Sequence, residues 1–371
     1  MSYSLTTLWF DRARYLPGVL AVGFSALLIA LQFGLLIGLF SITSLPIDHS
    51  HADIWVGAPF VQSVDLGRPV RENYLARVQA NPEVEKCEHY VQGFAYWTNP
   101  NGANGLCMVV GSRLFPDSMG KIAELSPDLA EKLTEPGSVV VDESDMDRLG
   151  IKGVGDSAEV NQAHVRVVGL TKGIKSLAGP YLFCSISTSQ HLLRLTSEQF
   201  TYALGKCKDP QGAMTVVNRL TEQGGISAFT ADDFSLKSRM HWLIKTKAGI
   251  ALGYAALLGL LVGAVVTSQT LYAATAASMK EFAVLRAMGI PRWRLASLVM
   301  AQATWVGVIG VIFSIPAVHG LAALAEYAGG NVVLPIWLQV GACVVTLVMA
   351  VGSGVVALRS LRQVEPAMLL R

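Results

Sequence analysis

Long runs without charge dominate the hydrophobic pattern of this chain of 371 residues. No Asp, Glu, Lys or Arg occurs in residues 15–47, 248–279, 295–325 or 327–358. A transmembrane helix needs roughly 20 apolar residues to cross a hydrocarbon core about 30 Å thick. Buried helices of soluble proteins are usually shorter and keep a polar face. The pattern therefore predicts four transmembrane helices.

The segment between the first two runs alternates polar and apolar positions like a soluble domain. Its first part, residues 52–59, reads as a strand, and residues 70–84 read as a helix that ends before Pro82. The turn-rich stretch 99–104 separates two strand patterns, which predicts a β-hairpin. Strands and helices continue to alternate up to residue 234. We predict a mixed α+β domain.

The predicted fold is a membrane protein with one transmembrane helix, a large α+β domain and then three more transmembrane helices. The first run is too long for the apolar part of a cleaved signal peptide, so it is expected to be retained. Its surplus length and that of the second run predict rigid rods that continue beyond the membrane. The predicted bounds are 16–45, 247–275, 294–324 and 334–358 for the spans, 46–246 for the α+β domain, and 325–333 for a short outer loop.

Composition supports this architecture. The chain is 52% hydrophobic, has a mean hydropathy of +0.44 and is only 15% charged, whereas soluble domains carry about a quarter charged residues. The net charge of +2 carries little information.

The distribution of basic residues over the short segments predicts the orientation. By the positive-inside rule, both termini and residues 276–293 are cytoplasmic, and the large domain lies outside. Arg239, Lys245 and Lys247 run against the rule, and contact with lipid headgroups is one interpretation of them. The basic residues that set the orientation are Arg12, Arg14, Lys280, Arg286, Arg292, Arg294, Arg359, Arg362 and Arg371, against Glu326 in the outer loop.

The predicted outer domain offers no recognisable catalytic motif. His49, His51 and Asp53 alternate as metal ligands on a strand would, but a polar linker is the expected content of a segment just outside a span. The sequence assigns no role to the two histidines. No phosphate-binding loop of the G-x-x-x-x-G-K-[S/T] type occurs. We therefore predict no metal, no cofactor and no catalysis on this chain.

Four of the five cysteines lie in the predicted outer domain, and Cys343 lies in the last span. An even number permits two disulfides with three possible connectivities. Four buried free thiols are the other interpretation, and the spacing does not distinguish them. These four residues are Cys87, Cys107, Cys184 and Cys207.

The spans carry no internal Asp, Glu, Lys or Arg, which argues against an ion-driven transporter. Three G-x-x-x-G pairs permit close approach of helices, either within one chain or between two copies. The pairs are Gly34 and Gly38, Gly249 and Gly253, and Gly259 and Gly263.

A basic island, SMKEFAVLRAMGIPRWRL, separates the second and third spans. Its apolar spacing predicts a short helix that ends at Gly289 and Pro291. A loop that only fixed the topology would need Lys and Arg but no helix with a defined end.

The island resembles the E-x-x-x-L-[R/K]-A-x-G signature of FtsX/MacB-type ABC transporter permeases. The one-plus-three helix layout and the C-terminal LRQVEPAMLLR are also similar to that family, so the resemblance covers the whole chain. Within the family, LQFGLLIGLF, ADIWVGAP and FAYWTNP look like the DevC-type subgroup. The paired histidines after the first span depart from that subgroup.

This resemblance implies a non-catalytic dimeric subunit that transmits the motion of a separate ATPase, an arrangement called mechanotransmission. Two copies of a cytoplasmic ABC ATPase, which bind ATP and Mg, would dock on the island as a coupling helix at 276–293. Residues 1–15 would form an amphipathic helix along the inner surface, and residues 359–371 a cytoplasmic tail. The implied docking residues are Lys280, Glu281, Phe282, Leu285, Arg286, Ala287, Met288 and Gly289.

A DevC-type permease of the inner membrane would work with a HlyD-like membrane fusion protein and a TolC-like outer-membrane channel to export a glycolipid. Three alternatives remain open: a lipoprotein-releasing permease, an FtsX-like regulator of a cell-wall hydrolase, and a membrane-anchored enzyme. The size of the outer domain favours export.

Overall fold

The computed structural model describes residues 12–99, 101–176, 179–277, 284–285, 288–327 and 331–362. These residues form two compact units, one of Leu39–Gly249 and one of Met1–Gly38 with Ile250–Arg371. The first unit is an α+β domain and the second is a bundle of long helices.

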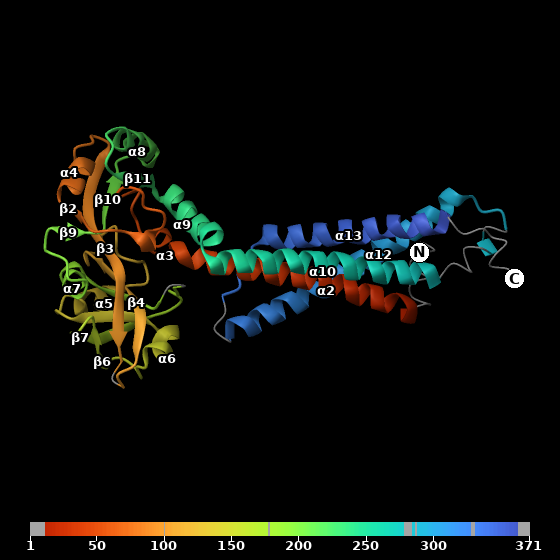
Figure 1. Cartoon of the computed structure of the whole chain (residues 1–371), viewed down its shortest axis with the longest axis horizontal. Coiled ribbons are helices and arrows are strands. Elements are labelled where there is room, and N and C mark those ends of the chain that lie inside the picture. Colours follow the sequence, from red (N-terminus) through yellow and green to blue (C-terminus); the bar gives the residue numbers. More distant parts are fainter. Residues whose placement is uncertain are drawn as a thin grey trace. The chain divides into compact units, whose positions relative to one another are not determined.

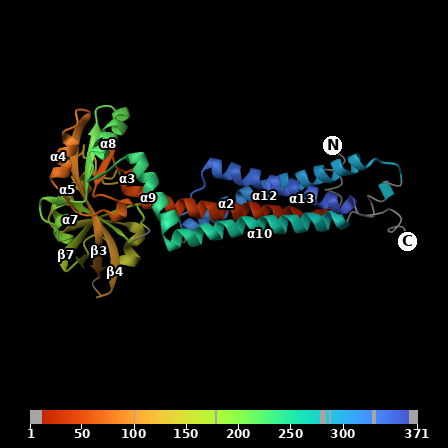
Figure 2. The same cartoon turned by 45° about the horizontal axis from the view of Figure 1, so that its top comes forward.

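The described part of the bundle contains four long apolar helices, which run side by side in Figures 1 and 2. Each is long and apolar enough to cross a membrane. Their lengths follow from uninterrupted Leu, Val, Ala and Gly. Pro17 falls in the first turns of its helix, while Pro316 lies inside another. The helices are α2 (Arg12–Ser41), α10 (Lys247–Ala277), α12 (Arg292–Tyr327) and α13 (Ile336–Arg362).

The α+β domain is built around a nine-stranded sheet in the order β11-β1-β10-β3-β4-β8-β5-β7-β6. Strands β2 and β9 form a separate antiparallel pair. The strands are β1 (Ile54–Gly57), β2 (Val70–Arg71), β3 (Val84–Thr98), β4 (Asn104–Ser112), β5 (Ser138–Asp142), β6 (Ser157–Val160), β7 (Ala163–Thr171), β8 (Tyr181–Ser185), β9 (Gln199–Phe200), β10 (Tyr202–Cys207) and β11 (Ser227–Thr230).

Strand β3 belongs to both halves of the domain and runs along its whole height in Figure 1. Its first half pairs with β10, and its second half pairs with both β4 and β6. Because β6 returns to β3, six strands close into a ring around a second apolar core that includes Trp97 and Cys107. The larger core, with Trp55, Tyr90 and Tyr202, fills the other half.

Short helices cover the sheet. Figure 1 shows α4 and α8 beside the half that contains β10 and β11. The helices are α3 (Leu45–Asp48), α4 (Asn73–Gln79), α5 (Pro127–Lys132), α6 (Met146–Leu149), α7 (Ile186–Leu192), α8 (Ala213–Glu222) and α9 (Ala231–Lys245), with 3-10 turns η1 (Ile42–Ser44), η2 (Val64–Leu66), η3 (Glu143–Asp145) and η4 (Pro210–Gly212).

The sequence predictions for this domain are largely confirmed. The strand expected at 52–59 is β1, and the predicted helix at 70–84 is the shorter α4. The turn at 99–104 joins β3 to β4 in a hairpin, with Thr98 opposite Asn104. Residues 231–234 belong to α9 rather than to the strand expected there.

The predicted rods are interrupted near the domain. The helix that begins at Arg12 tightens into a 3-10 turn at Ile42–Ser44 and ends at Asp48. Helix α9 ends at Lys245, and Thr246 has an extended backbone before α10 begins. The second rod is therefore two helices with a break at one residue, rather than one continuous helix.

Candidate functional site

The segment before α12 ends a helical turn at Gly289. The Met288 amide donates to the Val284 carbonyl at 3.0 Å, and the Ile290 amide donates to the Leu285 carbonyl at 3.2 Å. Gly289 has a φ of 90°, the left-handed conformation that glycine adopts at helix ends. The predicted helix end is therefore present in the structure.

Leu285 anchors this turn to α12. It is half-buried and packs with Ile290 against the buried Leu295 and Val299. Burial of such side chains contributes roughly 1.5–3 kcal/mol each. The turn and the start of α12 are thereby joined by an apolar contact, and only part of Leu285 is left for a partner.

Two apolar side chains of the same turn are exposed instead. Val284 is 51% and Met288 is 66% exposed, and their spacing of four residues places them on one helix face. Trp293, at the start of α12, is 67% exposed. The other predicted docking residues, which lie outside the described part of the chain, are Lys280, Glu281, Phe282, Arg286 and Ala287.

The first glycine pair packs within the chain. A Cβ atom at Gly34 would lie 2.8 Å from the Leu334 side chain, and one at Gly38 would meet the Asn331 carbonyl. The Asn331 side chain donates to the Gly38 carbonyl at 2.9 Å, and the Val333 amide donates to the Gly34 carbonyl at 3.2 Å. The segment before α13 thus lies against α2 where both glycines remove side-chain bulk.

A second glycine pair brings α10 close to α2. A Cβ atom at Gly259 would lie 3.2 Å from Gln32, and one at Gly263 would lie 3.2 Å from Ser25. The buried Ser25 hydroxyl donates to the Gly263 carbonyl at 3.0 Å and lies 2.9 Å from the Thr267 hydroxyl. This hydrogen-bonded contact needs the missing Cβ of Gly263.

The third pair differs between its two members. Gly249 lies under the helix break, where a Cβ atom would meet the Trp242 and Leu243 carbonyls. Gly253 has no atom within 4 Å of an added Cβ. Sequence reasoning missed Gly310 and Gly354, which pack α12 against α2 and α13. They lack the four-residue spacing that drew attention to the other pairs.

A polar cluster ties α3 to α9 within the α+β domain. The Arg239 guanidinium donates to Asp48 and to the Ser44 hydroxyl, with donor–acceptor distances of 2.6 and 2.7 Å. The Ser235 hydroxyl donates to the other Asp48 oxygen at 2.6 Å. We call these four residues the α3–α9 clasp. The Arg239 guanidinium is therefore held within the domain, and its contact with lipid headgroups stays an interpretation of the sequence.

A buried carboxyl lies beneath the same helix. Asp65 accepts hydrogen bonds from the Gln92 amide and from the Trp242 indole, both at 3.1 Å. The Asp65 side chain is only 5% exposed, and burial raises the pKa of its carboxyl from 3.8 to about 7. Asp65 thus links the core of the domain to α9 and changes its charge near neutral pH.

The paired histidines do not share a site with Asp53. His49 contacts Glu124 at 2.6 Å, His51 is exposed, and Asp53 binds Lys206 at 2.9 Å. Among the described residues, no group of three or more His, Cys, Asp or Glu is placed to hold a metal ion. The four cysteines of the domain are free thiols, as is Cys343.

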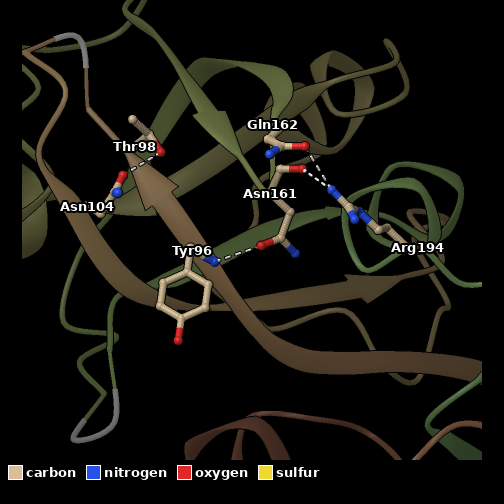
Figure 3. Close-up of a pocket in the computed structure, with 6 residues that line it drawn as sticks. All are labelled: Tyr96, Thr98, Asn104, Asn161, Gln162 and Arg194. Atoms are coloured by element: carbon tan, nitrogen blue, oxygen red, sulfur yellow. Dashed lines mark hydrogen bonds between the residues drawn. The ribbon is translucent and has the colours of Figure 1, made fainter.

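An open pocket of about 370 Å³ lies where β3 meets β6. Figure 3 shows Tyr96 between Thr98 and Asn104 on one side and Gln162 and Arg194 on the other. Tyr96 is 63% exposed. The residues that line the pocket are Tyr96, Thr98, Asn104, Asn161, Gln162 and Arg194.

Two family models match the chain, and together they cover most of it. The MacB-like periplasmic core domain matches residues 19–223, more than half of the chain, and the FtsX-like permease C-terminal model matches residues 253–366. The chain is an ABC transporter permease of the FtsX/MacB type. The α+β domain of the permease is accordingly an extracytoplasmic domain, and family membership implies an ABC ATPase as partner.

Two solved structures similar to the permease are extracytoplasmic regions of other transporters. The periplasmic region of MacB from Actinobacillus actinomycetemcomitans is 14% identical with a TM-score of 0.34, and the match covers 51% of this chain and 94% of that one. The extracellular domain of the noncanonic ABC-type transporter YknZ from Gram-positive bacteria is 6% identical with a TM-score of 0.32, covering 47% and 98%. No curated protein matches the permease.

Proposed function

We propose that this permease is the transmembrane subunit of an ATP-driven tripartite exporter in the bacterial inner membrane. Two copies of the chain would work with two copies of a cytoplasmic ATPase, a HlyD-like membrane fusion protein and a TolC-like outer-membrane channel. The cargo would be a lipid, a glycolipid or another periplasmic substrate. Family membership supports the ATPase, and the basic termini support a cytoplasmic location for both ends of the chain.

This proposal rests on the way in which the turn before α12 is packed. Leu285 and Ile290 fasten the turn to Leu295 and Val299, while Val284 and Met288 stay exposed. A turn that is fixed to a transmembrane helix and exposes an apolar face can receive a partner and pass its displacement to that helix. We propose that Val284 and Met288 contact the ATPase, in addition to the charged contacts of Glu281 and Arg286 that the sequence resemblance implies.

Co-purification of the permease with its ATPase tests this assignment. Val284→Asp combined with Met288→Asp should reduce ATPase binding at least about tenfold. Two apolar side chains that the ATPase would cover in the complex are replaced by charges. Val154→Asp combined with Met214→Asp, at exposed positions of the α+β domain, is the matched control and should bind normally. Unchanged binding by the double variant, and by Glu281→Lys with Leu285→Asp, would refute the docking role.

The cargo is tested in a deletion strain. Loss of a lipid or glycolipid from the outer membrane is the result expected for an exporter. Lipoproteins retained in the inner membrane would instead indicate a lipoprotein-releasing permease, and a division defect with normal lipids would indicate an FtsX-like regulator.

A further inference from the structure

Several polar residues of the pocket in Figure 3 have a backbone conformation that favours glycine. Asn161 and Gln162 are the two loop residues between Val160 and Ala163, with φ of 48° and 72°. A two-residue hairpin loop with both φ positive is a type I′ turn, in which Asn-Gly is preferred. Gln162 therefore has a backbone conformation that glycine adopts with less strain than a residue with a Cβ atom.

Arg194 occupies a second position of this kind. Helix α7 ends at Leu192, and Arg194 follows with a φ of 55°. The Leu195 amide donates to the Gln190 carbonyl at 2.8 Å, which is the hydrogen bond of a helix end that usually carries glycine. Of the four non-glycine residues with positive φ in the described chain, three line this one pocket, and the fourth is Phe60.

The hydrogen bonds inside the pocket leave mainly donors for a ligand. The Gln162 carbonyl oxygen accepts from Arg194 at 3.1 Å, and the Asn104 carbonyl oxygen accepts from the Thr98 hydroxyl at 2.7 Å. Their amide NH₂ groups remain available, together with the Tyr96 hydroxyl and the other Arg194 nitrogens. The Asn161 side chain is occupied at both ends, by Tyr96 and Leu192, so its role is to hold the loop.

Charge points in the same direction as the donors. Of the residues that line the pocket, only Arg194 is charged. The acid opposite Thr98 on β6 is Glu159, which lies 3.7 Å from the His164 ring and is not among the residues that line the pocket. A planar guanidinium beside the Gln162 amide fits a group with several acceptor oxygens and a negative charge.

We propose that this pocket binds a phosphate group, with Arg194 and Gln162 as donors, while Tyr96 and, on the other side of the pocket, Asn104 face the body of the ligand. The two glycine-favouring positions explain the geometry, because they turn long side chains toward one space at a cost to the backbone. An exposed apolar strip adjoins Tyr96, formed by Phe94 on the same strand and Leu106 opposite Tyr96. The site goes beyond the proposed export function and does not depend on it, because it makes no use of the ATPase.

Binding is measured on the full-length permease in detergent by isothermal titration calorimetry, at low ionic strength because salt screens an exposed charge. The probes are glycerol 3-phosphate, inorganic phosphate and neutral glycerol. Equal binding of both phosphates assigns the site to phosphate alone, whereas preference for glycerol 3-phosphate assigns it to a phosphorylated headgroup. Glycerol should not bind, and glycerol binding equal to that of glycerol 3-phosphate would overturn the proposal.

Glycine variants test the site without damage to the backbone. Arg194→Gly should weaken binding about tenfold, the effect of one charge-assisted hydrogen bond, and Gln162→Gly should weaken it less, while both proteins stay folded. Phe60→Gly relieves the same backbone conformation outside the pocket and should bind like the wild type. Arg194→Gln removes the charge and most of the donors but keeps a polar side chain, and it should also weaken binding if Arg194→Gly does not fold. Wild-type binding by both Arg194 variants, or no saturable binding by the wild type, would refute the site.

Discussion

At the scale of single residues, Asp65 is a carboxyl whose burial has a measurable consequence. Its side chain has two donors, Gln92 and Trp242, and lies near the buried Tyr90, which leaves the charged form poorly solvated. The folded state therefore holds a proton that the unfolded chain releases between the ordinary pKa of 3.8 and the folded value of about 7. Such a difference makes stability depend on pH.

Asp65→Asn should remove this dependence. The contribution of Asp65 is most favourable below about pH 4 and is lost as the pH rises through about 7, by roughly 2–4 kcal/mol. The variant should therefore unfold at a higher temperature than the wild type at pH 8 and show a smaller difference at pH 5. Thermal unfolding of the full permease at both pH values measures it. A wild-type stability that rises from pH 5 to pH 8 while the variant stays constant would contradict the assignment.

At Gln162 and Arg194 the backbone conformation favours glycine, whereas the proposed site needs a long polar side chain. A left-handed residue with a Cβ costs roughly 1–2 kcal/mol. Gln162→Gly and Arg194→Gly are thus each expected to leave the domain as stable or more stable, by up to about 1 kcal/mol, in denaturant titration. Gly150, at the end of α6 with a φ of 68°, provides the reverse comparison, because Gly150→Gln should destabilise.

At the scale of elements, the α3–α9 clasp joins the segment after the first span to the helix before the second. Arg239→Met keeps much of the side-chain volume but removes the bonds to Asp48 and Ser44. We expect faster amide hydrogen exchange in α9, unchanged ATPase binding and reduced transport. Lys245→Met, at the end of the same helix and outside the clasp, is the control. Equal exchange rates in both variants would show that the clasp does not hold α9.

The glycines of α10 give a second test at this scale. Gly263→Leu should destabilise the bundle by about 1–3 kcal/mol, because the new side chain would collide with Ser25. Gly253→Leu should leave the single chain intact, since nothing lies within 4 Å of that position. If a second copy packs there, Gly253→Leu lowers the dimer fraction in detergent. Equal loss of stability in the two variants would contradict the packing described above.

At the scale of the whole molecule, two chain connections join the units, one at Gly38–Leu39 and one at Gly249–Ile250. A flexible six-residue Gly-Ser linker inserted after Gly249 should leave both units folded and ATPase binding intact, yet abolish ATP-driven transport (length chosen for about 13 Å of reach). The same linker after Gly102, in the exposed hairpin turn, should preserve transport. Transport retained after the first insertion would show that motion does not pass along α10.

Sequence patterns predicted most of this architecture because the signals are strong and local. Four charge-free runs give four apolar helices, and alternation around residues 99–104 gives the β3–β4 hairpin. The helix end at Gly289 was also predictable, since glycine followed by proline acts within a few residues. The break at Thr246 was not predictable, because Gly249, which packs beneath it, lies within the charge-free run and looks like part of the span.

The pocket and the clasp could not be predicted, because their members come together only through long-range pairing. Tyr96 and Asn161 are 65 positions apart and meet because β6 returns to β3. Asp48 and Arg239 are 191 positions apart. In the sequence, each looks like an ordinary charged residue of a solvated linker. The signature of the island predicted that Leu285 faces the ATPase. In the structure, its contact with Leu295 directs it toward α12.

By itself, the sequence determined the number and order of the apolar helices, the α+β character of the domain and the family. Hydrophobicity and turn chemistry decide these properties over windows of a few residues. The tertiary structure alone decided which glycines pack within the chain, which carboxyl is buried and which polar side chains share one pocket. These properties depend on the register of strands and the packing of helices, where residues far apart in sequence set each other's surroundings.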